Sequence, residues 1–283
     1  MAAARALDRL MLESGLRRAI ERDELALHYQ PQFDSGTNAL VGVEALLRWT
    51  HPEMGAISPE RFIPVAENCG LIAPLGEWVM REAFGRQRAW ACAGRSQLVV
   101  AVNVSALQFR KADFVDGVQR LLRETGADPA RIELEITESA LMQPSEELFS
   151  QLDRLVGLGI RLALDDFGTG YSSLAYLKRL PIHRLKLDRS FVCDLPGDVE
   201  DAAIASAALS MARDLGIEVV AEGVETDAQR DYLAARGCRL MQGYLFARPL
   251  SLAAFEAQFP VVRTADGASG PGACDRGGTA SSP

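Results

Sequence analysis

The sequence predicts an α/β domain whose parallel strands close into a barrel. Stretches typical of strands alternate with stretches typical of helices along most of the chain, which is the order of repeated βα units. Several strand-like stretches are apolar at nearly every position, as strands buried on both faces are. About eight such strands in 283 residues, 48% of them hydrophobic, favour a closed barrel over an open sheet. No GxGxxG motif follows the first strand, which further weakens a dinucleotide-binding open sheet.

The first elements are a helix and a hairpin. Apolar residues at helical spacing predict a helix over Leu7–Arg22. Leu25–Phe33 and Ala39–Trp49 flank the turn-rich segment DSGTN, so we expect them to form two antiparallel strands. We therefore expect residues 1–22 to form an N-terminal helix or linker, and residues 23–262 to form the barrel.

Further strands follow, separated by helical segments. The expected strands are Leu98–Val104, Ile132–Ile136, Arg161–Leu164, His183–Leu187, Ile217–Ala221 and Leu240–Leu245. The expected helices are Pro59–Asn68, Gly76–Cys92, Asp113–Glu124, Ser145–Gly157, Ala202–Leu215 and Asp227–Arg236. Residues 263–283 are rich in Gly, Ala, Ser and Pro, and we expect a disordered tail there because the segment has little to bury.

The composition is typical of an acidic, reduced protein. The formal net charge is -8, which argues against non-specific binding to nucleic acid polymers or anionic lipid. The five cysteines include no CxxC pair, so a disulfide framework or a zinc site is not expected. No secretory signal and no membrane-spanning apolar run is visible, so a cytoplasmic location is expected.

Polar and charged side chains lie at the ends of the predicted strands. They are Glu44, Asn103, Glu135, Glu138, Asp165, Asp166, Lys186, Asp188, Glu222, Glu225 and Gln242. Barrel strands deliver their C-terminal residues to one face, so we expect a cluster of carboxylates whose mutual repulsion divalent cations would relieve. Oxygen ligands without His or Cys favour Mg²⁺ or Mn²⁺ over Zn²⁺. The adjacent Asp165 and Asp166 suit a two-metal site of the kind found in phosphoryl-transfer hydrolases.

Simpler explanations exist for single members of this set. A lone strand-end carboxylate, such as Glu44 or Glu222, is more often a cap or a solvated group than a ligand. Lys186 could pair with Asp188 or another acid, or it could orient hydroxide beside bound metal. As a set the acids are hard to explain as structure. The residues alone therefore predict a two-metal hydrolase and leave its substrate open.

A series of spaced motifs identifies a family resemblance. The motifs are YQP (29–31), EALLRW (44–49), HPEMG (51–55), NVS (103–105), ELEITES (133–139), DDFGTGYSSL (165–174), LKLDRSF (185–191), AEGVET (221–226) and QGYLFARPL (242–250). Together they resemble the EAL domain, a bacterial phosphodiesterase of cyclic di-GMP, over roughly residues 12–260. The resemblance implies a modified TIM (β/α)8 barrel with an antiparallel first strand, which agrees with the predicted hairpin. It also implies hydrolysis of cyclic di-GMP to linear pGpG by metal-activated water.

The resemblance also implies roles for particular residues. The implied metal ligands are Glu44, Asn103, Glu135, Asp165, Asp166 and Glu222, with Asp165 bridging two ions. The implied catalytic residues are Lys186, which would contact the attacking water, Glu222, a candidate base, and Glu44. The implied substrate-binding residues are Gln30, Arg48 and Gln242, and the residues expected to support the DDFGTGYSSL loop or a dimer are Glu138, Glu225 and Asp188.

Cofactors, partners and one alternative complete these expectations. Two Mg²⁺ or Mn²⁺ ions are expected, and Ca²⁺ is expected to inhibit because its coordination geometry is less strict. The chain is expected to form a homodimer, and upstream sensory or GGDEF domains in a longer chain are compatible with the leading helix. The alternative is a catalytically silent receptor for cyclic di-GMP. In such a receptor some metal ligands should be missing, and none of them is missing here.

Overall fold

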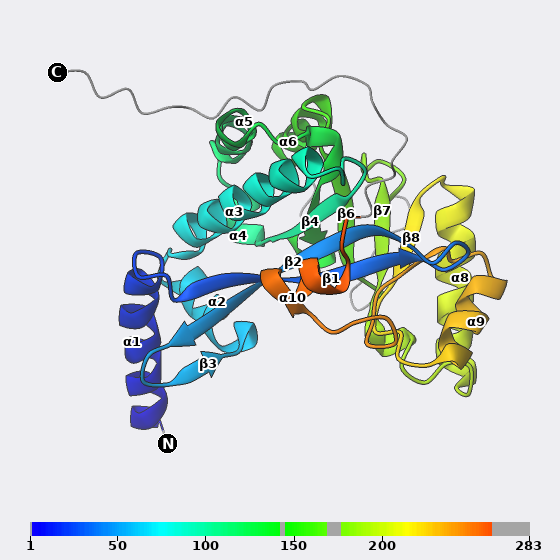
Figure 1. The fold of residues 1–283 in the computed structure, drawn as a ribbon, viewed down its shortest axis with the longest axis horizontal. Coiled ribbons are helices and arrows are strands. Elements are labelled where there is room, and N and C mark those ends of the chain that lie inside the picture. The colour runs from blue at the N-terminus through cyan, green and yellow to red at the C-terminus, as the bar shows by residue number, and fades with distance from the viewer. Residues whose placement is uncertain (1, 142–144, 169–176, 262–283) are drawn as a thin grey trace.

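Eight strands close into a barrel in the computed structural model, which describes residues 2–141, 145–168 and 177–261 (Figure 1). These strands are β1 (Leu25–Asp34), β2 (Ala39–His51), β4 (Val99–Val104), β5 (Ile132–Thr137), β6 (Arg161–Phe167), β7 (Arg184–Leu187), β8 (Glu218–Ala221) and β9 (Leu240–Met241). Strands β2 and β4 to β9 pair in parallel. Strand β1 closes the barrel, antiparallel to both β2 and β9. The predicted barrel and its antiparallel first strand are confirmed.

Helices surround the barrel (Figure 1). They are α3 (Ile72–Cys92), α4 (Ala106–Phe109), α5 (Phe114–Thr125), α6 (Glu146–Gly157), α8 (Val199–Asp214), α9 (Asp227–Ala235) and α10 (Leu252–Gln258), with short 3-10 helices η1 (Pro129–Arg131), η2 (Glu138–Leu141) and η3 (Arg189–Phe191). The expected helices in this part of the chain are present. Helix α3 begins four residues before its expected start at Gly76, because Ile72 and Leu75 are buried in a neighbouring hydrophobic cluster.

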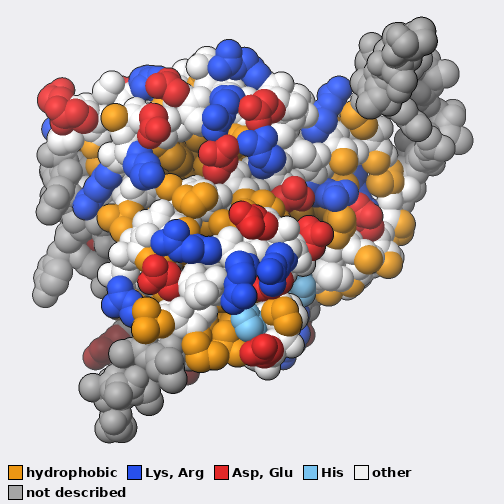
Figure 2. All heavy atoms as spheres, turned by 90° about the vertical axis from the view of Figure 1, so that its left-hand side faces the viewer, with side chains coloured by type: hydrophobic (Ala, Val, Ile, Leu, Met, Phe, Trp, Pro, Cys, Tyr) orange, Lys and Arg blue, Asp and Glu red, His pale blue; other side chains and the backbone are white. Residues whose placement is uncertain are grey.

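That neighbouring cluster joins the N-terminal helix to the barrel. Helix α1 (Ala2–Ala19), α2 (Pro59–Asn68) and strand β3 (Gly55–Ile57) lie together at one end of the molecule (Figure 1). Leu16 is fully buried there, and the rings of Trp49 and Phe62 meet edge to face at 5.5 Å. On the outer surface of this end, acidic, basic and apolar side chains are interspersed (Figure 2).

The last barrel strand is shorter than expected. We expected it to span Leu240–Leu245, but β9 ends at Met241. A Cβ on Gly243 would lie 2.1 Å from the carbonyl oxygen of Val224, so the chain packs against the loop after β8 there. The backbone N–H of Leu245 donates to Val224 at 3.0 Å. A short strand, β10 (Leu250–Ser251), then pairs with the outside of β1.

Two further expectations concern membranes and the tail. None of the described helices is long and apolar enough to span a bilayer. The tail expected at 263–283 lies outside the described residues.

Candidate active site

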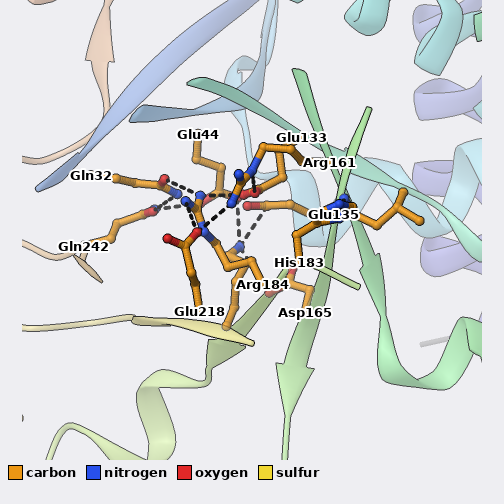
Figure 3. Close-up of polar contacts among 12 residues, drawn as sticks. Gln32, Glu44, Glu133, Glu135, Arg161, Asp165, His183, Arg184, Glu218 and Gln242 are labelled. Atoms are coloured by element: carbon orange, nitrogen blue, oxygen red, sulfur yellow. Dashed lines mark hydrogen bonds and ion pairs between the residues drawn. The ribbon is translucent and has the colours of Figure 1, made fainter. Parts of the chain in front are cut away.

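One buried lysine is surrounded by four carboxylates inside the barrel. Lys186, on β7, is 1% exposed. Its Nζ lies 2.8 Å from Glu135 Oε2, 2.8 Å from Glu222 Oε1, 3.1 Å from Asp165 Oδ1 and 3.5 Å from Glu44 Oε1. Figure 3 shows Glu44, Glu135 and Asp165 reaching this region from three different strands. The barrel therefore gathers four of the strand-end acids that the sequence singled out.

Amide side chains fix the orientation of Glu44. Asn103 Nδ2 donates to Glu44 Oε1 at 2.7 Å, and Gln242 Nε2 donates to Glu44 Oε2 at 2.6 Å. Gln242 Nε2 also lies 3.1 Å from Gln30 Oε1. Each oxygen of Glu44 thus accepts a hydrogen bond, which holds the carboxylate in one position.

The surroundings shift the pKa values of two of the acids in opposite directions. Burial opposes ionisation of Glu44, but the Lys186 ammonium and the two amide donors outweigh it and lower the pKa of Glu44. Burial and the negative charge of Glu44 raise the pKa of Glu135 well above its ordinary value. Of these two acids, the site therefore favours the ionised form at Glu44 and the protonated form at Glu135.

Lys186 and Glu222 are shifted as well. Burial opposes the charge on Lys186, but the surrounding acids, Glu135 and Glu222 first, raise its pKa well above the ordinary value. Burial raises the pKa of Glu222 to about 7, against the opposing effect of the Lys186 ammonium. A carboxyl that titrates near neutral pH is suited to accept or donate a proton during a reaction.

The residues present fit divalent cations. Four carboxylates share one ammonium, so negative charge is in excess. The atoms available to bind a metal are all oxygen atoms, which Mg²⁺ and Mn²⁺ prefer as ligands. Glu135 Oε1 is buried and has no hydrogen-bond partner in the described part of the chain. No group of three or more His, Cys, Asp or Glu side chains among the described residues is arranged as a metal cluster.

A cavity of about 490 Å³ opens beside these residues. Its polar lining includes Gln30, Glu44, Glu222, Glu225 and Gln242. The exposed side chain of Tyr244 also lines it, with the Arg248 guanidinium stacked 4.2 Å from the ring centroid. Its volume lies within the range of about 300–1,000 Å³ that is usual for small-molecule sites.

Some predicted residues lie at the margin of the cluster. Asp166 has an exposed side chain and a left-handed backbone at φ 55°, and partial desolvation by its surroundings, together with the charges of Asp165 and Asp188, raises its pKa. Asp188 accepts a hydrogen bond from Ser190 N at 2.9 Å at the start of η3. Arg48 is half-buried and donates to the carbonyl of Leu47 at 2.9 Å.

Glu138 lies apart from the cluster and supports the strand end. Its Oε2 accepts a hydrogen bond from Gly168 N at 3.3 Å. This contact joins η2 to the segment that directly follows β6. The rest of the expected DDFGTGYSSL loop, from residue 169 on, lies outside the described residues.

A second layer of buried polar residues was missed. Arg184 Nη1 donates to Glu133 Oε1 at 2.8 Å and lies 3.5 Å from Gln32 Oε1, and Gln32 Nε2 donates to Gln242 Oε1 at 3.0 Å. Each of Gln32, Glu133 and Arg184 lies two positions before or after a predicted site residue on its own strand. Alternate residues of a strand share a face, and this spacing could have revealed the second layer.

Comparison with known proteins shows that the chain is similar to a family of domains and to named relatives. A family model described as EAL domain matches residues 13–249. The bifunctional diguanylate cyclase/cyclic di-GMP phosphodiesterase MucR of Pseudomonas aeruginosa is 47% identical over 247 residues, which are 87% of this chain and 36% of that protein. The cyclic di-GMP phosphodiesterase NbdA of the same species is 47% identical over 252 residues, which are 89% of this chain and 32% of that protein. The chain thus spans about a third of the length of these curated relatives.

Solved structures agree with the match. The structure of the PaMucR phosphodiesterase in a c-di-GMP complex is similar with a TM-score of 0.83 and 46% identity, covering 86% of this chain and 98% of that one. A cGMP-bound form of the EAL enzyme Bd1971 is similar with a TM-score of 0.85 and 34% identity, covering 91% of this chain and 71% of that one.

Proposed function

The chain belongs to the EAL domain family, and from this premise we propose that it is a metal-dependent phosphodiesterase that hydrolyses cyclic di-GMP to linear pGpG. The observation that carries the proposal is the contact of Lys186 with four strand-end carboxylates inside the barrel. Relatives at 47% identity are named cyclic di-GMP phosphodiesterases. Such a reaction would lower the concentration of a bacterial second messenger, and we place it in the cytoplasm.

Divalent cations would be held by residues of this cluster. We assign them to Glu44, Asn103, Glu135, Asp165, Asp166 and Glu222. Two bound Mg²⁺ or Mn²⁺ ions would activate a water molecule and neutralise charge on the phosphate. The Oε1 of Glu135, which has no hydrogen-bond partner among the described residues, and the surplus of carboxylates over ammonium groups support this assignment.

The chain's own residues would carry the proton and orient the reacting groups. Water adds to one phosphorus, the bond from that phosphorus to the ribose 3′-oxygen breaks, and the product keeps a 5′-phosphate. Lys186 would orient the attacking water and stabilise negative charge in the transition state. Glu222, whose pKa is raised to about 7, would accept the proton that the water loses.

Substrate would occupy the cavity of about 490 Å³. Gln30 and Gln242 line this cavity, and we assign them, with Arg48, to substrate binding. Glu138 would hold the strand end at Gly168, and Glu225 and Asp188 would support the neighbouring loops. We further propose a homodimer, Ca²⁺ inhibition, and a place for this domain beside sensory or GGDEF domains in a longer chain.

A chromatographic assay for pGpG tests this function. With Mn²⁺, the purified chain should convert cyclic di-GMP to pGpG, and Glu44→Gln should lower kcat/KM by more than about a hundredfold. The reason is that outer-shell partners of a metal already contribute about 10–100-fold. Glu60→Gln, which removes a carboxylate from the exposed surface of α2, is the matched control and should retain full activity. Tight cyclic di-GMP binding by the folded, Mn²⁺-loaded chain without pGpG would instead favour a receptor.

A further inference from the structure

A second cavity, of about 590 Å³, lies at the opposite end of the barrel from Lys186. Its lining includes residues at or next to the starts of parallel strands, among them Arg161 of β6, Arg184 of β7 and Glu218 of β8. The acids of the candidate active site lie farther along the strands, as Asp165 does on β6, or directly after them, as Glu222 does after β8. The two cavities are therefore separate sites.

This base cavity is strongly basic in an otherwise acidic chain. Its arginines are Arg131, Arg161, Arg184, Arg213, Arg236 and Arg239. Only three carboxylates accompany them, two in the lining, Asp34 and Glu218, and one behind it, Glu133. Six guanidinium groups against three carboxylates leave an excess of positive charge, although the net charge of the chain is -8.

Part of this positive charge is held rigidly inside the barrel. Arg184 is 4% exposed and its guanidinium contacts Glu133 at 2.8 Å and Glu218 at 3.3 Å. Arg161 joins the same two carboxylates (Figure 3). The Nε atoms of Arg184 and Arg131 are buried and have no hydrogen-bond partner among the described residues. A buried donor without a partner is unusual in a folded protein, so part of the charge of these two guanidinium groups has no hydrogen-bonded acceptor among the described residues.

The rest of the positive charge stands at the mouth of the cavity. Arg213 donates to the Ser210 hydroxyl at 3.1 Å, and Arg236 donates to the Ser206 hydroxyl at 2.9 Å while stacking on Tyr232. Within the described parts of the chain, neither guanidinium has a carboxylate partner. The guanidinium groups of Arg213 and Arg236 are thus positioned by uncharged side chains, and their positive charge is not neutralised by a nearby carboxylate of the described residues.

The geometry points to a binding site for a small phosphate-bearing anion. We propose that the base cavity binds such an anion. The guanidinium groups of Arg213 and Arg236 would donate hydrogen bonds to the phosphate oxygens, and the buried Arg184 would add positive charge behind them. Guanidinium groups match phosphate oxygens in pairs. The cavity volume is in the range of about 300–1,000 Å³ usual for small ligands. Leu40, Val41, Leu209 and Ile217 add apolar walls that suit a ring attached to the phosphate.

Calorimetry in EDTA tests the proposal without any contribution from metal or turnover. Pyrophosphate and ATP are the probes, and one site per chain with a sub-millimolar dissociation constant is expected for at least one of them. If ATP binds more tightly than pyrophosphate, the site recognises a nucleotide. If ATP binds equally or more weakly, the site recognises the phosphate group alone. Absence of saturable binding for both probes would overturn the proposal.

Paired arginine variants locate the binding. The Arg213→Gln/Arg236→Gln double variant should bind at least about tenfold more weakly, because hydrogen bonds to charged groups contribute about 1.5–3 kcal/mol each. The Arg110→Gln/Arg123→Gln double variant removes equal charge from exposed residues outside the cavity and should bind within about twofold of the unmodified chain. Equal loss of affinity in the two double variants would show that the anion is held by general positive charge and would refute a specific site in the cavity. Should circular dichroism show that the first pair unfolds the chain, the single variant Arg213→Gln replaces it under the same criterion.

Discussion

At the scale of single residues, Lys186 governs the charge balance of the candidate active site. Its ammonium contacts four carboxylates within 3.5 Å and is almost completely buried. A buried ion pair is costly to break by removal of one partner, because the other charge stays behind uncompensated. Lys186 therefore stabilises the metal-free site and stands where a transition state would need positive charge.

Replacing Lys186 separates its catalytic role from metal binding. Lys186→Met keeps an unbranched side chain that is one atom shorter and removes the charge. We expect kcat to fall by about 10²–10³, as when a single charge-stabilising donor is removed, while Mn²⁺ affinity is kept or increased because the competing ammonium is gone. Hydrolysis rates and Mn²⁺ calorimetry measure the two effects. The exposed Lys178→Met is the matched control, and an unchanged kcat in Lys186→Met would rule out the proposed role.

Glu222 gives a pH dependence to the metal-free protein. Burial raises the pKa of Glu222 to about 7 from an ordinary value of 4.5, so the folded state binds this proton more tightly than the unfolded state. Its contribution to stability is complete below about pH 4.5 and is lost as the pH rises through about 7. Urea unfolding in EDTA should show the free energy of unfolding falling less steeply over this window in Glu222→Gln than in the unmodified chain. Identical slopes would contradict the raised pKa.

At the scale of elements, the turn after β9 fixes the position of Gln242. Gly243 lies so close to Val224 that an added Cβ would be 2.1 Å from its carbonyl oxygen. Because Gln242 donates to Glu44 at 2.6 Å, a shift of this turn would also move an amide that lines the cavity beside Lys186. The backbone contact between the loops after β8 and β9 is thus coupled to the site.

A pair of glycine substitutions tests this coupling. Gly243→Ala should destabilise the chain by about 1–3 kcal/mol, the usual effect of overpacking, and should lower kcat/KM as well. Gly85→Ala, in helix α3, has open space around the added methyl and should be neutral or stabilising by up to about 1 kcal/mol. Urea unfolding and the pGpG assay provide both measurements. Equal stability of the two variants would show that the turn can adapt.

Barrel strands were predictable where burial on both faces produced apolar runs. Asp165 and Glu222 were predictable because they directly follow such runs. Glu44 and Glu135 were predictable because each is a charged residue inside one. The end of β9 was predicted wrongly, because the apolar residues continue past Gly243 and only the contact with Val224 ends the strand. Elements of two to four residues, such as β3, α4 and β10, are too short to show a period.

The amide network could not be predicted from local patterns. Gln32 and Gln242 are 210 positions apart and meet only because β1 closes the barrel against β9. The Glu133–Arg184 pair was hidden for a different reason. Each of its members lies two positions before a predicted site residue, Glu133 on β5 and Arg184 on β7, and this spacing indicates a shared face but does not say which residue of another strand is the partner.

At the scale of the whole molecule, one barrel separates two sites of opposite charge. The acidic site around Lys186 lies toward the C-terminal ends of the parallel strands, and the arginine-rich cavity lies around their starts. Parallel strands make this separation possible because all their C-terminal ends meet at one face. The account of function depends on the acidic face alone.

Metal-dependent hydrolysis measured against protein concentration tests the central claim most directly. The pure chain is incubated with cyclic di-GMP and Mn²⁺ over a range of protein concentrations, with EDTA and Ca²⁺ as parallel conditions. We expect pGpG only with Mn²⁺ or Mg²⁺, with a specific activity that rises with concentration as a homodimer forms. Binding of cyclic di-GMP without pGpG at any concentration of folded, Mn²⁺-loaded protein, or equal turnover in EDTA, would contradict a metal-dependent phosphodiesterase.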